Sequence, residues 1–129
     1  MILTETGYVA KAENVMKSIV VKDRNGKSKI ELTTSKIRNL LSMISDIYND
    51  VTHVSEDHLS DDIISRIQYL KMRFAYEAGR EREVMNLVEK AEIFQALDEI
   101  GNDRKQLILF CHYMEALVAY RKFYGEKDD

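Results

Sequence analysis

The feature that most constrains the fold is an apolar run near the end of the chain. Between Leu107 and Tyr120, twelve of fourteen residues are apolar or aromatic, and only His112 and Glu115 interrupt them. A helix over 103–124 is therefore apolar on nearly every side and has to be surrounded by other helices. The run is shorter than the roughly 20 apolar residues that a membrane-spanning helix needs. We expect an all-α bundle with this C-terminal helix at its centre, and no membrane partner.

Composition agrees with one small helical domain. The 129 residues include no proline and only five glycines, so few helix breaks are enforced. With 45% hydrophobic residues the chain can build one core, and we expect a single domain over 1–129. The formal charge of -3 means that any contact with nucleic acid needs a local basic patch. No secretion signal or lipidation motif is present, so a cytoplasmic protein is expected.

Apolar residues at helical spacing predict four further helices. The second is expected to begin at Thr33 or Thr34, Gly101 is expected to stop the fourth, and Gly125 to end the fifth in the left-handed conformation. Whether the third and fourth helices are separated at Gly79 or run together is left open by the pattern. The expected bundle of about five helices covers 7–21, 33–51, 61–79, 81–100 and 103–124.

The most polar stretch, 22–32, has Asn25-Gly26 at its centre. An Asn-Gly pair favours a tight turn, and the residues on either side could form a short hairpin. The alternation there is too brief to bury one face, so a mobile loop is the preferred interpretation and the hairpin the alternative.

Three arginines form the best candidate for a binding surface. Arg66, Arg73 and Arg80 are seven residues apart, so on a helix they drift by only about 20° per step and form one stripe about 21 Å long. Tyr69 and Tyr76 stand beside this stripe. Because arginine forks bind phosphate oxygens bidentately, the stripe is a plausible surface for a nucleic-acid backbone.

A structural interpretation competes at every basic position. Glu77 and Glu81 are close enough to pair with the stripe, which would make it a salt-bridged flank. Lys71 lies on another side of the same helix. Arg121 and Lys122 end the last helix, where cations complement the helix dipole without any ligand.

Lys36 and Arg38 lie in the first turn of the second helix, where the helix dipole makes cations mildly unfavourable. Because the two residues contribute little to helix stability, they are free to have another role. No catalytic or metal motif accompanies these residues. The loop 52–60 contains His and carboxylate residues without a known ligand spacing, and Cys111 lies inside the apolar run as a small buried side chain. We expect no enzyme activity, no cofactor and no metal.

Three stretches together resemble a known family: LTTSKIRNLL at 32–41, LKMRFAYEAGR at 70–80 and YMEALVAYRKFYG at 113–125. Their order and spacing are similar to the small helical subunit of the Csm effector of type III-A CRISPR systems. The resemblance covers nearly the whole chain, and its specificity lies in the three motifs together.

The resemblance implies a non-catalytic protein that assembles with other Csm subunits and with further copies of itself. It would help to hold the guide RNA/target RNA duplex through backbone contacts. Lys36, Arg38, Lys71, Arg73 and Arg80 fall on the family's basic positions, whereas the match leaves open whether the terminal pair meets RNA or protein. The expected RNA-binding residues are Lys36, Arg38, Arg66, Lys71, Arg73, Arg80, Arg121 and Lys122.

The runner-up is a helical protein-protein adaptor with no direct RNA contact. A continuous basic face uniting the second and third helices would favour RNA, and carboxylates interleaved among the cations would favour the adaptor. If the two helices present their basic residues on opposite sides of the bundle, the RNA surface is wrong.

Overall fold

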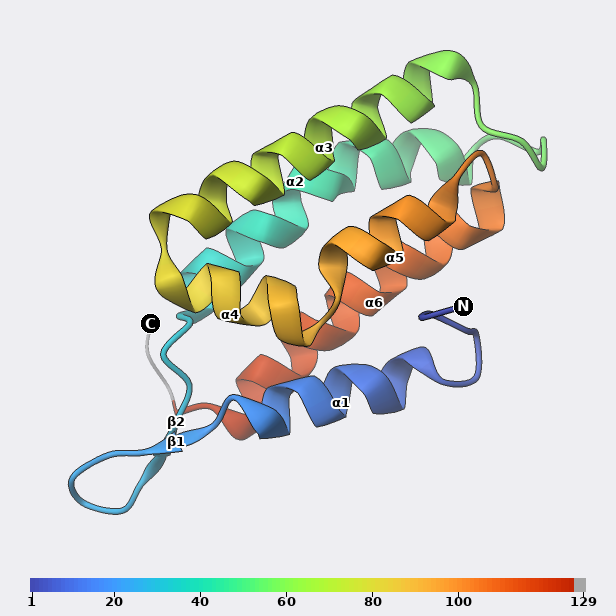
Figure 1. Ribbon diagram of the computed structural model, residues 1–129. Helices are drawn as coiled ribbons and strands as arrows, with labels where there is room; N and C mark the ends of the chain where they lie inside the picture. The colour runs from blue at the N-terminus through green and yellow to red at the C-terminus, as the bar shows by residue number, and fades with distance from the viewer. Residues whose placement is uncertain (127–129) are drawn as a thin grey trace.

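The computed structural model describes residues 1–126, which form six α-helices and one two-stranded antiparallel sheet (Figure 1). The predicted all-α class is confirmed. In chain order the elements are α1 (Tyr8–Ser18), β1 (Val21–Lys22), β2 (Ser28–Lys29), α2 (Thr34–Thr52), α3 (Asp61–Arg80), α4 (Arg82–Lys90), α5 (Ile93–Ile100) and α6 (Arg104–Tyr124).

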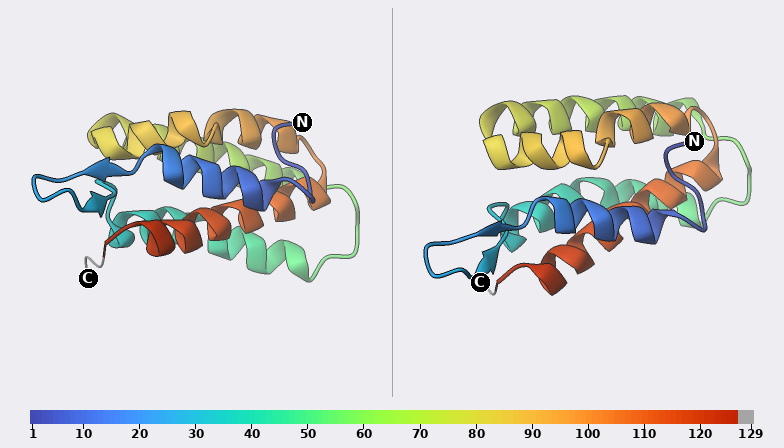
Figure 2. Two further views of the ribbon diagram at one scale, coloured as in Figure 1. Left: turned by 90° about the horizontal axis from the view of Figure 1, so that it is seen from below. Right: turned by 60° about the horizontal axis from the view of Figure 1, so that its bottom comes forward.

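The helices lie in two layers, with α3, α4 and α5 in one and α1, α2 and α6 in the other (Figure 2). The last helix, α6, packs against α1, α2 and α5. Its buried side chains include Leu109, Phe110, Cys111 and Tyr113, and Leu109 and Cys111 lie about 200° apart around the helix, so more than one side of it is covered. The central position expected for this helix is therefore confirmed.

Polar caps set the helix starts where the sequence placed them. The Thr33 hydroxyl accepts a hydrogen bond from the Lys36 amide, and the Ser60 hydroxyl accepts one from the Ile63 amide. At α6 the Asp103 carboxylate accepts from the amide of Lys105. Each cap satisfies an amide that has no partner inside its own helix.

The single helix expected over 81–100 is wrong, because the chain breaks there into α4 and α5. Glu92 has a φ of 56°, in the left-handed region, between the two helices. In one continuous helix Ile93 would lie about 200° around the axis from Ala91, whereas the break lets both side chains be fully buried. The buried Tyr113 hydroxyl donates to the Ala91 carbonyl at 2.9 Å, which satisfies the backbone at the break.

A similar break separates α3 from α4, and it is not at Gly79. Gly79 lies inside α3, and the extended residue Glu81, with φ -129° and ψ 120°, ends one helix and begins the next. The two helices are therefore separate but almost contiguous, and α4 turns back along α3 (Figure 1).

The segment after α1 forms a short hairpin, which was the alternative to the preferred prediction of a loop. Val21 pairs with Lys29 and Lys22 with Ser28, and Gly26 adopts a φ of 77° in the connecting turn. The loop was preferred because apolar and polar residues alternate only briefly within the two strands. Ile30 and Leu32, directly after β2, are buried in the core and hold the hairpin base. How mobile the hairpin is stays a prediction.

Gly125 ends α6 for a different reason from the one expected. Its φ of -89° and ψ of 160° are extended, not left-handed. A Cβ atom at this position would clash with Nη1 of Arg121. Glycine is therefore required by the close approach of a side chain, not by the backbone conformation.

No helix within residues 1–126 is both long enough and apolar enough to cross a bilayer.

A candidate nucleic-acid interface between α2 and α3

A hollow of about 370 Å³ lies where the first half of α2 meets the end of α3. From α2 it takes residues spaced three and four apart, which share one face of that helix. From α3 it takes two arginines of the predicted stripe. The lining residues are Lys36, Asn39, Leu40, Ser42, Met43, Arg73, Glu77, Arg80, Glu81 and Val84.

Lys36 lies at one side of this hollow in a double ion pair. Its Nζ atom is 2.6 Å from Oε2 of Glu81 and 2.6 Å from Oε1 of Glu83. Hydrogen bonds to Glu81 and then to Glu83 raise the pKa of Lys36. The hydrogen bond from Lys36 in turn lowers the pKa of Glu83. Both side chains are therefore held in their charged forms.

Arg73 and Arg80 reach the hollow from α3 and converge on one carboxylate. An Nη atom of each lies 3.9 Å and 3.7 Å, respectively, from Oε1 of Glu77. These distances permit attraction but exceed those of a direct hydrogen bond. Both guanidinium groups also lie over the Tyr76 ring, 5.7 Å and 5.6 Å from its centroid, within cation-π range.

The hollow is therefore not the continuous basic face that would favour RNA, although Lys36, Arg73 and Arg80 line it together. Basic residues of α2 and α3 lie on the same side of the bundle, as an RNA surface requires. Carboxylates are interleaved among them, as an adaptor surface would have. The cations of the hollow are therefore partly neutralised by its carboxylates.

Comparison with known proteins decides the family. The family model described as Csm2 Type III-A matches residues 11–127. The chain belongs to the Csm2 family. It is 50% identical over 127 residues to a protein of Streptococcus thermophilus named "CRISPR system Cms protein Csm2", with 98% of each chain covered.

More distant relatives carry the same name. A protein of Enterococcus italicus is 43% identical over 114 residues, which cover 84% of this chain and 81% of the relative. A protein of Mycobacterium tuberculosis is 38% identical over 128 residues, with 99% of both chains covered. The resemblance drawn from the three motifs is thus confirmed over nearly the whole chain.

The other five cations predicted for this Csm2-family chain lie outside the hollow, three of them on α2 and α3. Arg66 begins the stripe but pairs with Asp50 of α2 at 2.6 Å. Lys71 points toward α5, where its Nζ atom is 2.7 Å from Asp98. Arg38 is exposed but lies about 200° around α2 from Lys36, so it faces another direction.

The terminal basic pair is divided between core and solvent. Arg121 is only 1% exposed, and its Nε atom donates to the Leu32 carbonyl at 2.6 Å. Burial leaves this guanidinium no surface for RNA, so the prediction of an RNA contact is corrected to a structural role. Lys122, the next residue, is exposed.

Two polar residues of the hollow were missed in the sequence analysis. Asn39 and Ser42 follow Lys36 at steps of three, so their place on its face of α2 could have been read from the spacing. Both carry groups that can donate hydrogen bonds to phosphate oxygens. Neither side chain is charged, so a pattern of cations in the sequence does not include them.

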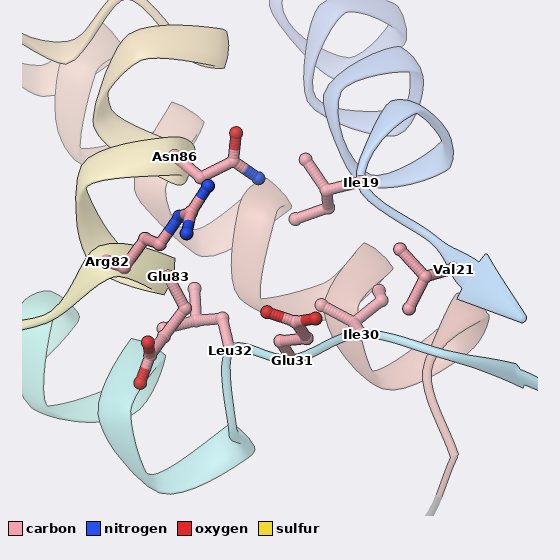
Figure 3. Close-up of a pocket in the computed structure, with 8 residues that line it drawn as sticks. All are labelled: Ile19, Val21, Ile30, Glu31, Leu32, Arg82, Glu83 and Asn86. Atoms are coloured by element: carbon pink, nitrogen blue, oxygen red, sulfur yellow. The ribbon is translucent and has the colours of Figure 1, made fainter. Parts of the chain in front are cut away.

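A second hollow, of about 450 Å³, lies between the base of the hairpin and α4 (Figure 3). Arg82 and Asn86 of α4 lie next to each other on one side of this space, and Ile19, Val21 and Ile30 lie on the other side. Glu83, which pairs with Lys36, also borders this space. The ion pair between Lys36 and Glu83 therefore links the linings of the two hollows, and the first hollow gathers more cations than the second.

Cys111 is buried, as its place in the apolar run predicted. Burial raises the pKa of its thiol to about 12, so the thiol stays protonated near neutral pH. Within residues 1–126, no three His, Cys, Asp or Glu side chains gather closely enough to hold a metal ion.

Proposed function

We propose that this chain is a non-catalytic subunit that lines the guide RNA/target RNA channel of a type III-A effector and contacts the RNA backbone through Lys36, Arg73 and Arg80. Membership of the Csm2 family itself makes it a small subunit of a CRISPR Csm complex, with other Csm subunits as its partners. Contacts with RNA and with further copies of the chain belong to the proposal, as does a cytoplasmic location.

One observation carries the proposal: cations from two different helices line the same hollow. Arginine forks and a lysine around one concave site are suited to phosphate oxygens. Such contacts position a protein on a duplex without reading its sequence. Sequence specificity would then come from pairing between guide and target, as in other RNA-guided effectors.

The remaining predicted cations take secondary places in this proposal. Arg66 and Lys71 would contact RNA only by exchanging a carboxylate partner for phosphate. Arg38 and Lys122 are exposed and could meet RNA outside the hollow. Arg121 is left out because it is buried.

A protein-protein adaptor is the second candidate, and two observations favour it. Glu77 and Glu81 lie among the cations of the hollow. Tyr69, Met72 and Tyr76 of α3 are 60%, 56% and 56% exposed and follow one another at helical spacing. Exposed aromatic and methionine side chains of this kind are enriched in protein interfaces.

RNA retention by the co-expressed complex tests the proposal. The variant replaces Lys36, Arg73 and Arg80 by Ala, and target RNA is titrated against the purified assembly over a salt series. We expect intact assembly, weaker RNA binding and a shallower salt dependence. The slope should fall by about 0.7 for each single-strand phosphate that the variant no longer binds, and by a similar amount on a duplex.

A matched control replaces three exposed cations elsewhere, Arg24, Lys90 and Lys105, by Ala, which changes the net charge equally. This control should bind RNA like the parent complex. If the test variant folds alone but no longer joins the complex, the adaptor is the better proposal. Unchanged RNA binding by an assembled test variant would also contradict the RNA surface.

A further inference from the structure

Glu77 occupies an unusual place for a carboxylate on a basic stripe. It is the shared partner of Arg73 and Arg80, and it lines the hollow with them. We infer that Glu77 holds the place of an RNA phosphate in the free protein and competes with RNA for the two arginines. This inference rests on the proposed RNA function and adds an attenuating residue to it.

The geometry of the pair supports competition instead of a permanent bridge. At 3.7 Å and 3.9 Å, Glu77 attracts both guanidinium groups without taking up their hydrogen-bond donors. The side chain of Arg73 is 43% exposed and that of Arg80 is 55% exposed, so solvent screens both ion pairs. A phosphate oxygen placed between the two forks could accept direct hydrogen bonds that Glu77 does not accept.

The other ion pairs near this surface are tighter. Lys36, Arg66 and Lys71 each lie 2.6 to 2.7 Å from a carboxylate oxygen, within direct hydrogen-bond distance. Among these paired cations, Arg73 and Arg80 therefore lose the least ion-pair energy when they bind an RNA phosphate instead of a carboxylate. Both guanidinium groups also lie over the Tyr76 ring, an attraction that does not involve the Glu77 carboxylate.

The consequence is a low affinity of a single free chain for RNA. Glu77 cancels part of the positive potential at the site where phosphate would bind. Removing its charge without changing its shape should strengthen RNA binding through Arg73 and Arg80 alone. A purely structural role for Glu77 predicts no such gain.

The test measures binding of the full chain to a short fluorescent RNA duplex by anisotropy, comparing the parent protein with Glu77→Gln. We expect binding about threefold to tenfold tighter, since two weak exposed pairs are released together. The gain should shrink between about 50 and 200 mM salt, because the interaction is screened. The control is Glu56→Gln, in the loop at the opposite end of α3, which makes the same change in net charge.

A double-mutant cycle separates this inference from the proposed function. Glu77→Gln should give no gain in a chain that also carries Arg73→Ala and Arg80→Ala. An equal gain in that background, or in Glu56→Gln, overturns the inference as a general charge effect, and so does the absence of any gain in the parent background. If Arg73→Ala with Arg80→Ala leaves RNA binding unchanged, the proposed RNA surface itself fails. Thermal melting of each variant shows whether the fold is retained.

Discussion

Arg121 and Lys122 are adjacent in the sequence and opposite in their surroundings. Arg121 follows Leu117 by four residues, so it continues the stripe of α6 that faces the core. Lys122 is rotated by a further 100° and reaches solvent. The buried guanidinium is bonded to the Leu32 carbonyl before α2 and to the Glu126 carbonyl after α6. Arg121 therefore connects the segment that precedes α2 with the segment that follows α6.

Replacing Arg121 by Ala should lower the free energy of unfolding by about 2 to 4 kcal/mol. The change removes a charged donor from the buried Leu32 carbonyl and leaves a cavity. Urea denaturation measures the decrease, with Lys122→Ala as the matched control. The control should stay within about 0.5 kcal/mol of the parent, because its side chain is exposed. Parental stability of Arg121→Ala, combined with weaker RNA binding, would restore Arg121 to the RNA surface.

The structural role of Arg121 could be predicted from the sequence only in part. Its position four residues after a core leucine predicts burial as well as the dipole predicts a terminal cation. The acceptor is the backbone carbonyl of Leu32, 89 residues earlier in the chain. No side-chain pattern marks a carbonyl as a partner, so this hydrogen bond could not be foreseen.

At the scale of elements, α6 organises the bundle. Helices α1, α2 and α5 pack around it, and its Leu117 is fully buried. A helix with apolar residues on nearly all sides can be stable in water only in such a position. The same apolar run that predicted the fold therefore also explains why the other helices lie where they do.

Replacing Leu117 by Ala should cost about 2 to 5 kcal/mol of unfolding free energy, the usual range for a leucine removed from a packed core. Val9→Ala, on an exposed face of α1, provides a control that should change stability by less than about 0.5 kcal/mol. Denaturant melts of both variants provide the measurement. A decrease below about 1 kcal/mol for Leu117→Ala would contradict the central placement of α6.

Helix starts were predictable because they depend on residues within one turn. Thr33, Ser60 and Asp103 cap their helices through neighbours two or three positions away. The break at Glu92 was not predictable, since α4 and α5 together follow a plausible continuous stripe. It depends on packing against Tyr113 and on the ion pair between Glu92 and Lys11 of α1. Both interactions join residues far apart in the sequence, so the local spacing of apolar residues does not predict them.

At the scale of the whole molecule, the arrangement of charge matters more than its sum. The chain has a formal charge of -3, yet three cations from α2 and α3 meet in one hollow. The spacing predicted the arginine stripe, and pairing with Glu77 or Glu81 was the competing structural interpretation. The pairing of Lys36 with Glu81 and Glu83 joins residues 45 and 47 positions apart, so it could emerge only from the fold.

This charge arrangement predicts that RNA binding is a property of the assembly. A single copy offers a few partly neutralised cations, whereas under the proposed function copies aligned along one duplex would bind it in concert. Linked weak sites commonly gain about 10² to 10⁴ in overall affinity without any new interaction. Anisotropy titrations of one RNA duplex with the free chain and with the complete complex should show a difference of this order.

The contribution of this subunit to that difference can be isolated within the complex itself. An assembly whose copies carry Arg73→Ala and Arg80→Ala should decrease in affinity more than the free chain does, because the arginines of every copy are removed at once. Equal decreases would mean that the copies do not bind RNA in concert. A free chain that binds as tightly as the complex would contradict the dependence on assembly, since alignment could then add nothing.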